Sequence, residues 1–198
     1  MSGITGDRRR RRRSDAERSA VAVLDAAVEV LGRHPEAKVE QVASAAGVTR
    51  QTVYAHYPSR PLLVAAVIER ITAEAVAALD AADVDSGTAA EALQRWLDVT
   101  WRLFDRYPLL LHPSVTAMEQ ADTDRQHAAV IERLERLIRR GQATGEFDPT
   151  LSSAWLVSAT IALGHAAGGE VAAGRMTTAQ TAAALTHSIL RVYGVRES

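Results

Sequence analysis

The 198-residue sequence contains no cysteine, which excludes disulfides and thiolate metal sites. Proline and glycine are scarce, at 6 and 12 residues, and this favours helices over sheet. The most apolar stretch, "AWLVSATIALGHAAGGEVAAG", includes His165 and Glu170 and is too polar to span a bilayer. The charged N-terminus is not followed by an apolar run, so it does not resemble a secretory signal. We therefore expect a cytoplasmic, all-α protein that does not enter a membrane.

Motifs of common enzymes are also missing. The sequence has no HExxH, no glycine-rich phosphate loop and no GxSxG. His165 and Glu170 lie about 140° apart around their expected helix, which places them poorly for cooperation. We expect neither an enzyme nor a bound cofactor or metal ion.

Charge is distributed unevenly along the chain. Residues 1–60 hold 11 Lys and Arg against 7 Asp and Glu, whereas the remainder holds 12 against 17. A basic N-terminal third on an acidic body suggests that this end meets a polyanion. Residues 1–13 include six consecutive arginines and no apolar periodicity, so we expect a disordered basic arm. This arm either contacts DNA or is a solvated tail.

Apolar periodicity predicts helices through the rest of the chain and no strand. The first begins after Ser14, where Glu17 completes a capping-box spacing, and it presents Val21, Leu24, Val28 and Leu31 on one face. We expect helices at about 14–31, 39–46, 49–57, 61–79, 88–107, 109–120, 124–142, 150–173 and 177–193. The polar stretch "DAADVDSG" separates an N-terminal domain, 14–80, from a larger C-terminal regulatory and dimerisation domain, 81–198.

The stretch "VEQVASAAGVTRQTVYAHYPSRPLL" predicts a helix-turn-helix over about residues 38–57. Gly47 suits the turn, and Thr49 suits the N-cap of the second helix. At about 100° per residue, Val53 and Tyr57 face inward while polar side chains face outward. Such a helix can read bases at its N-terminal end and bind phosphates beside it. The candidate DNA-binding residues are Thr49, Arg50, Gln51, Thr52, Tyr54, His56 and Arg60.

These residues carry a family resemblance. Residues 18–68 resemble the N-terminal domain of TetR-type transcriptional regulators, with Tyr54, His56, Tyr57 and Arg60 at the family's positions. One departure is Pro61, where an acidic residue is common. The resemblance implies a homodimer on a double-stranded, palindromic DNA operator. It also implies a repressor that a small molecule releases from the DNA. A transcriptional activator and a non-sensing DNA-binding protein of the same fold remain alternatives.

The C-terminal body offers a dimer interface and a ligand site. Helices 150–173 and 177–193 are rich in small residues, which permit close helix packing in a four-helix interface or in an intramolecular core. The resemblance also places the homodimer contact there. Large or polar residues that could surround a small, largely apolar effector are Trp96, Trp101, Phe104, Tyr107, His112, Met118, Glu119 and His165. For each of these alone, ordinary core packing is the alternative.

Overall fold

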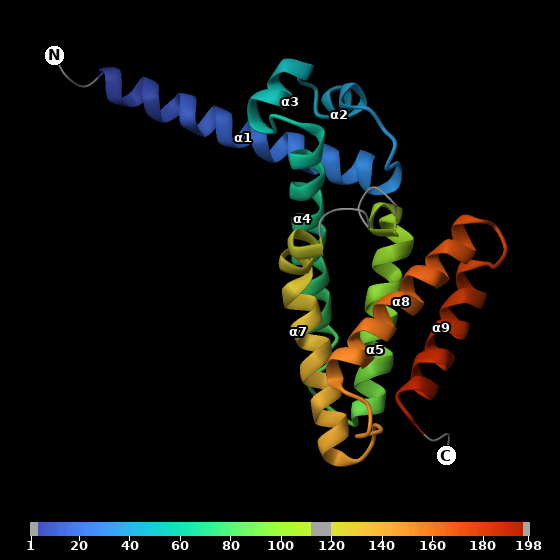
Figure 1. The fold of residues 1–198 in the computed structure, drawn as a ribbon. Helices are drawn as coiled ribbons and strands as arrows, with labels where there is room; N and C mark the ends of the chain where they lie inside the picture. Colours follow the sequence, from blue (N-terminus) through green and yellow to red (C-terminus); the bar gives the residue numbers. More distant parts are fainter. Residues whose placement is uncertain (1–3, 112–119, 196–198) are drawn as a thin grey trace. The chain divides into compact units, whose positions relative to one another are not determined.

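A computed structural model describes residues 4–111 and 120–195, without the side chains of residues 4–16 and 120–127. Every regular element in these residues is a helix, which confirms the all-α prediction (Figure 1). The chain divides into two compact units, Met1–Ile71 and Thr72–Ser198, called unit 1 and unit 2 below. Among the described residues, no helix is long and apolar enough to cross a membrane.

The first helix, α1 (Ile4–Arg33), begins well before the predicted N-cap at Ser14. Residues 4–13 are therefore helical in the structure, whereas the sequence pattern predicted a disordered arm. Arginine is a strong helix former, and lengthening an existing helix avoids the cost of nucleation. The arginine-rich segment can therefore continue α1 although it has no apolar face.

The buried face of α1 also differs from the predicted stripe. Val23, Ala27 and Leu31 are almost fully buried, but Val21 is 55% exposed. The segment "VAVLDAAVEVL" offers more than one apolar stripe, since valine and alanine recur closely along it. Packing against α2 and α3 selects the face that becomes buried.

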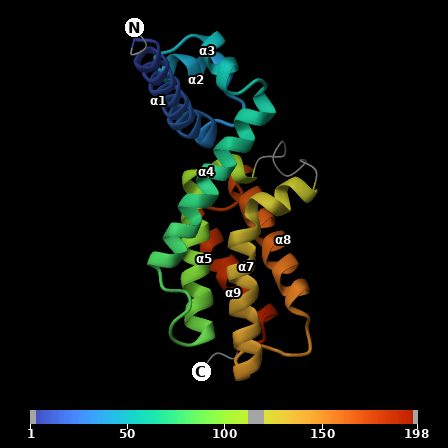
Figure 2. The same cartoon turned by 90° about the vertical axis from the view of Figure 1, so that its left-hand side faces the viewer.

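Helices α2 (Val39–Ala45) and α3 (Arg50–His56) form a helix-turn-helix. Gly47 has a φ of +65° in the turn between them, a conformation that other residues rarely adopt. Val42 and Val53 are 0% and 1% exposed and anchor the two helices in the small core of unit 1. Both helices pack against α1 (Figure 2).

Helix α4 (Arg60–Ala81) contains the division between the units, at Ile71 and Thr72. The sequence pattern placed this boundary after residue 80. The polar stretch there ends a helix, but Ala75 and Leu79 before it are already buried.

The other helices of unit 2 are α5 (Ala89–Arg106), the 3-10 helix η1 (Pro108–Leu111), α7 (Gln120–Thr144), α8 (Ser153–Ala172) and α9 (Thr178–Val192). Helix α5 packs against α7 and α9, and α8 packs against the same two helices. Of the helix predicted at 109–120, residues 109–111 belong to η1 and Gln120 begins α7; residues 112–119 lie outside the described residues.

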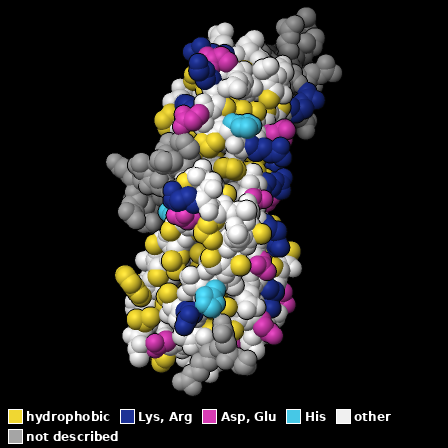
Figure 3. Space-filling model, turned by 90° about the vertical axis from the view of Figure 1, so that its right-hand side faces the viewer, with side chains coloured by type: hydrophobic (Ala, Val, Ile, Leu, Met, Phe, Trp, Pro, Cys, Tyr) yellow, Lys and Arg dark blue, Asp and Glu magenta, His cyan; other side chains and the backbone are white. Residues whose placement is uncertain are grey.

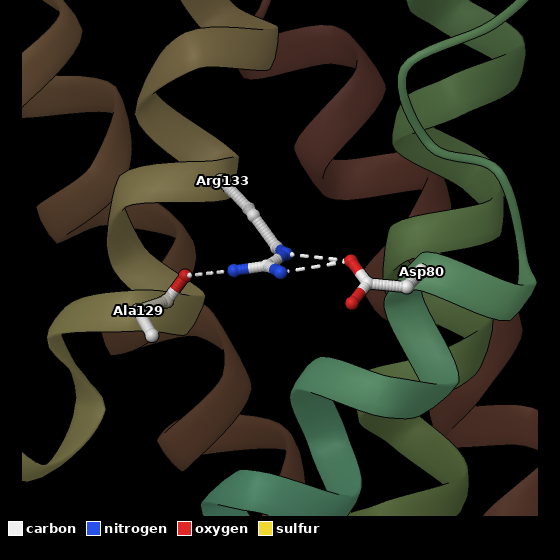
Figure 4. A network of polar contacts seen from close by, with 3 residues as sticks. All are labelled: Asp80, Ala129 and Arg133. Carbon is white, nitrogen blue, oxygen red and sulfur yellow. Dashed lines mark hydrogen bonds and ion pairs between the residues drawn. The ribbon is translucent and has the colours of Figure 1, made fainter.

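Two polar links join the C-terminal part of α4 to its neighbours. Arg133 of α7 contacts Asp80 at 2.8 Å and donates to the Ala129 carbonyl at 3.2 Å (Figure 4). Glu74 accepts from the Tyr107 hydroxyl at 2.8 Å and pairs with Arg106 at 2.7 Å. These contacts connect α4 with α5 and α7 inside unit 2.

An aromatic pair closes one end of unit 2. The rings of Phe147 and Tyr193 meet edge to face, with centroids 5.1 Å apart. The Tyr193 hydroxyl lies 2.8 Å from Oγ1 of Thr160, and burial raises the pKa of Tyr193 to about 12. A Cβ added at Gly141 would collide with the Phe147 ring, so this glycine permits α7 to approach it.

Candidate functional sites

The N-terminal end of α3 exposes a polar group of side chains. Oγ1 of Thr49 accepts a hydrogen bond from the Thr52 backbone N–H at 3.2 Å, which caps the helix. The two threonine hydroxyls lie 2.9 Å apart. Thr49, Arg50 and Gln51 are all exposed, so this end of α3 presents two hydroxyls, a guanidinium and an amide to a partner.

The guanidinium of Arg50 has two neighbours in unit 1. Its Nη1 lies 2.7 Å from a carboxylate oxygen of Glu40 on α2. Its carbon Cζ lies 5.5 Å from the centroid of the Tyr54 ring, within the range of a cation–π interaction. The side chain nevertheless remains 59% exposed. Arg50 is therefore oriented by protein contacts while still open to a further contact.

The two faces of α3 agree with its predicted orientation. Val53 is buried, and Tyr57 is half-buried just beyond the helix end. Burial raises the pKa of Tyr57, and the nearby carboxylate of Asp25 raises it further. Tyr54 and His56 are half-buried beside this inner face, while Gln51 lies outside.

Arg60 begins α4 and is half-buried. Its Nη2 donates a hydrogen bond to the Pro35 carbonyl, in the turn between α1 and α2. Neither this contact nor the Glu40–Arg50 pair is predicted from the sequence. Each joins residues that are distant in the sequence, and no local spacing signals it.

Four candidate ligand residues lie on α5 or at its C-terminal cap. Trp96 and Tyr107 are 7% and 4% exposed. At about 100° per residue these two lie about 20° apart around the helix axis, whereas Phe104 and Trp101 lie about 80° and about 140° from Trp96. Phe104 lies against Gly164 of α8, where an added Cβ would be 3.7 Å from its ring. The four side chains therefore extend over about 140° around the helix axis.

Two of these residues carry buried indole N–H groups. Among the described residues, neither the indole N–H of Trp96 nor that of Trp101 makes a hydrogen bond. A buried donor of this kind is costly unless water or another molecule satisfies it. The tryptophan side chains thus offer hydrogen bonds inside unit 2 that its described residues do not use.

One further ligand candidate, His165, is described on another helix. His165 lies on the exposed side of α8, where partial burial of its ring lowers its pKa. His112, Met118 and Glu119 lie outside the described residues. A shallow surface groove of about 380 Å³ lies elsewhere, between α5 and α9, and contains none of the eight candidates. Its lining residues are Asp98, Ala182, Ala183, Thr186, His187 and Leu190.

Helices α8 and α9 leave apolar and small side chains at the surface of unit 2. On α8, Trp155 is 60% exposed and Ile161 is 40% exposed. Figure 3 shows the side of the molecule that lies on the right in Figure 1, and hydrophobic side chains are spread over its lower part. One small residue of α8 packs in the interior, since Gly168 is buried and lies close to Leu111 of η1. This contact agrees with the alternative of an intramolecular core.

Comparisons with known proteins agree with the helix-turn-helix geometry. Residues 23–67 match the family model described as bacterial regulatory proteins, tetR family. The chain is 37% identical over 126 residues to the HTH-type transcriptional repressor LfrR of Mycolicibacterium smegmatis. The helix-turn-helix region of this chain therefore matches the TetR family. The aligned region covers 61% of this chain, and the chain spans less than two thirds of LfrR, 65%.

Solved structures extend the likeness to the C-terminal unit. The TetR-like regulator LfrR from Mycobacterium smegmatis, in complex with proflavine, superposes with a TM-score of 0.64 at 29% identity, covering 92% of this chain and 98% of that one. The fatty acid degradation regulator FadR from Bacillus halodurans has a TM-score of 0.72 at 15% identity, covering 86% and 94%. At that identity FadR shows the fold alone. The family and LfrR are regulators and not enzymes, which confirms that expectation.

Proposed function

We propose that this chain is a TetR-family, DNA-binding transcriptional repressor. The exposed N-terminal end of α3 is the observation that carries the proposal, because Arg50 and Gln51 stand there with bidentate hydrogen-bonding groups. Arginine pairs with guanine and glutamine with adenine in the major groove. The short helix after a glycine turn has the length and exposure of a recognition helix.

Each DNA-facing residue has a distinct role in this proposal. Arg50 and Gln51 read base edges, and Tyr54, His56 and Arg60 bind backbone phosphates. The Thr49 hydroxyl caps the helix, and the Thr52 hydroxyl lies beside it at the same end, next to the expected phosphate. Arg60 can bind a phosphate while it contacts Pro35, since a guanidinium carries five N–H donors.

The repressor acts as a homodimer through α8 and α9. The exposed Trp155 and Ile161 support this, since side chains of this kind are favourable when a second copy covers them. A two-fold dimer presents two recognition helices about one DNA turn apart, which matches a palindromic operator.

A small, largely apolar ligand binds unit 2 and lowers operator affinity. The unpartnered indole N–H groups of Trp96 and Trp101 support a site in this unit, and LfrR was crystallised with proflavine. By linkage, the ligand must bind the DNA-incompetent state better, and DNA must weaken ligand binding by the same factor. A coupling of about 1–3 kcal/mol gives roughly 5- to 150-fold regulation.

Selection from a randomised duplex DNA library tests the DNA-binding proposal. We expect the wild-type protein to enrich a palindrome. Arg50→Ala should then cost about 1–3 kcal/mol and relax the preference at one position of each half-site. Arg70→Ala is the matched control, because it removes the same charge from an exposed arginine of unit 1 that pairs with Asp25. If Arg50→Ala lowers the affinity for all DNA sequences equally, Arg50 does not read a base.

Tryptophan fluorescence tests the ligand proposal, with proflavine as the first probe. We expect Trp96 and Trp101 emission to change on binding, and operator affinity to fall with the ligand present. A compound that binds tightly without altering operator affinity would favour the non-sensing alternative for that compound.

A further inference from the structure

The ion pair between α2 and α3 places a carboxylate next to the proposed base-reading arginine. Glu40 and Arg50 lie 2.7 Å apart, yet their side chains are 53% and 59% exposed. Ion pairs this exposed contribute little to folding stability. A carboxylate beside a DNA-binding helix also repels phosphates, so it opposes binding to any DNA. A contribution to folding stability therefore does not account for a carboxylate that weakens DNA binding.

The geometry around Arg50 suggests what Glu40 does instead. Glu40 engages Nη1 of the guanidinium, and the Tyr54 ring lies 5.5 Å from its central carbon. A long arginine side chain loses rotamer freedom when it binds, and restraint before binding reduces that loss. The guanidinium has five N–H donors, so the pair with Glu40 leaves others for a bidentate contact with guanine.

We propose that Glu40 is a specificity-determining positioning residue that directs Arg50 toward a base edge and away from phosphates. This inference rests on the proposed DNA-binding function. Two effects combine in it: the charge of Glu40 lowers affinity for every duplex, and its restraint of Arg50 in a conformation suited to a base offsets this loss only on DNA that carries that base. Glu40 acts through Arg50 and makes no contact with the base itself.

Glu40→Gln tests the proposal, since the substitution removes the charge and preserves the shape. The measured quantity is the ratio of affinities for the duplex selected from the randomised library and for a scrambled duplex. We expect this ratio to fall about three- to fivefold, in keeping with the small energy of an exposed pair. The fall should come mainly from tighter binding to the scrambled duplex. The thermal unfolding midpoint should stay unchanged.

Glu29→Gln is the matched control, because Glu29 is an exposed carboxylate on α1 of the same unit. It changes the net charge equally and should leave the ratio unchanged. In an Arg50→Ala background, Glu40→Gln should no longer alter the ratio. An equal ratio change in that background, or in Glu29→Gln, would overturn the role of Glu40.

Arg50→Lys gives a second measurement that does not depend on substituting Glu40. Lysine keeps the charge but lacks the planar fork, so it should lose preference at the same operator position. Full retention of that preference would also overturn the proposal. The experiments distinguish a failure of the proposed DNA-binding function from a failure of the role of Glu40. A wild-type protein that selects no sequence contradicts the DNA-binding function. If Arg50→Ala relaxes a real preference and Glu40→Gln does not, only the role of Glu40 fails.

Discussion

Between Thr49 and Arg60, one stretch of unit 1 carries every residue that we assign to DNA, whereas the candidate ligand residues of unit 2 extend from Trp96 to His165. A surface that meets a groove can be built on one short helix, because helical periodicity alone decides which side chains face outward. A pocket must be enclosed by several helices. The residues that line it therefore depend on how those helices pack. In the sequence, a pocket residue is hard to distinguish from a residue of the hydrophobic core.

The units also differ in how their exposed faces are composed. The outward face of α3 is polar, with Arg50 and Gln51 exposed, while α8 exposes Trp155 and Ile161. A polar face suits a charged polymer in water, and an apolar face suits a second protein surface.

The largest effect should come from a charge on the apolar face of α8. In the homodimer proposed above, Ile161→Glu should separate the two subunits, because a buried carboxylate without a partner opposes association. A monomer holds one half-site, so operator affinity should fall about 10²- to 10⁴-fold. Sedimentation equilibrium and operator titration measure the two effects. Val21→Glu, at an apolar residue of α1 that is 55% exposed, should leave the dimer intact. A dimeric Ile161→Glu protein would place the interface elsewhere.

A substitution inside unit 2 should weaken folding without touching either face. Gly141→Ala forces a Cβ into the Phe147 ring, and such overpacking costs about 1–3 kcal/mol in the free energy of unfolding. Gly169→Ala is the matched control in another helix, since nothing lies within 4 Å of its added Cβ. There alanine should stabilise by up to about 1 kcal/mol. Urea unfolding measures both, and equal effects would contradict the close packing at Gly141.

Deleting residues 1–13 should change how DNA affinity depends on salt. These residues contribute six arginines to the N-terminal end of the chain. For each phosphate that the shortened protein no longer neutralises, the slope of log affinity against log salt should flatten by about 0.9. Operator titrations at several salt concentrations give this slope. An unchanged slope would make the segment a solvated extension of α1.

The smallest effect concerns pH and His165. Because partial burial lowers its pKa in the folded state, the unfolded chain binds a proton first as the pH falls. The folded state should therefore lose stability below the unfolded value of about 6.5. Urea unfolding of His165→Gln should show a smaller loss between about pH 8 and about pH 5.5 than the wild type. His34→Gln, at an exposed histidine of unit 1, serves as the control. Identical pH profiles for His165→Gln and the wild type would contradict this contribution.

The sequence alone determined the helical class and the orientation of α3. Gly47, Thr49 and Val53 act within one or two helical turns, so local conformational preferences and periodicity suffice to predict the turn, the cap and the inward face. The same locality explains why the family resemblance could be found in so short a stretch.

Only the tertiary structure decided which apolar stripe of α1 is buried, where the units divide, and which partners Arg50 and Arg60 have. Leu31 belongs both to the predicted apolar stripe with Val21 and to the observed buried face with Val23. Packing against α2 and α3 therefore determines which of the two is buried. Glu40 and Arg50 meet because two helices cross, and Pro35 meets Arg60 because the chain returns past its own earlier turn. Such contacts depend on the path of the whole chain, while periodicity reports only on neighbours within one helix.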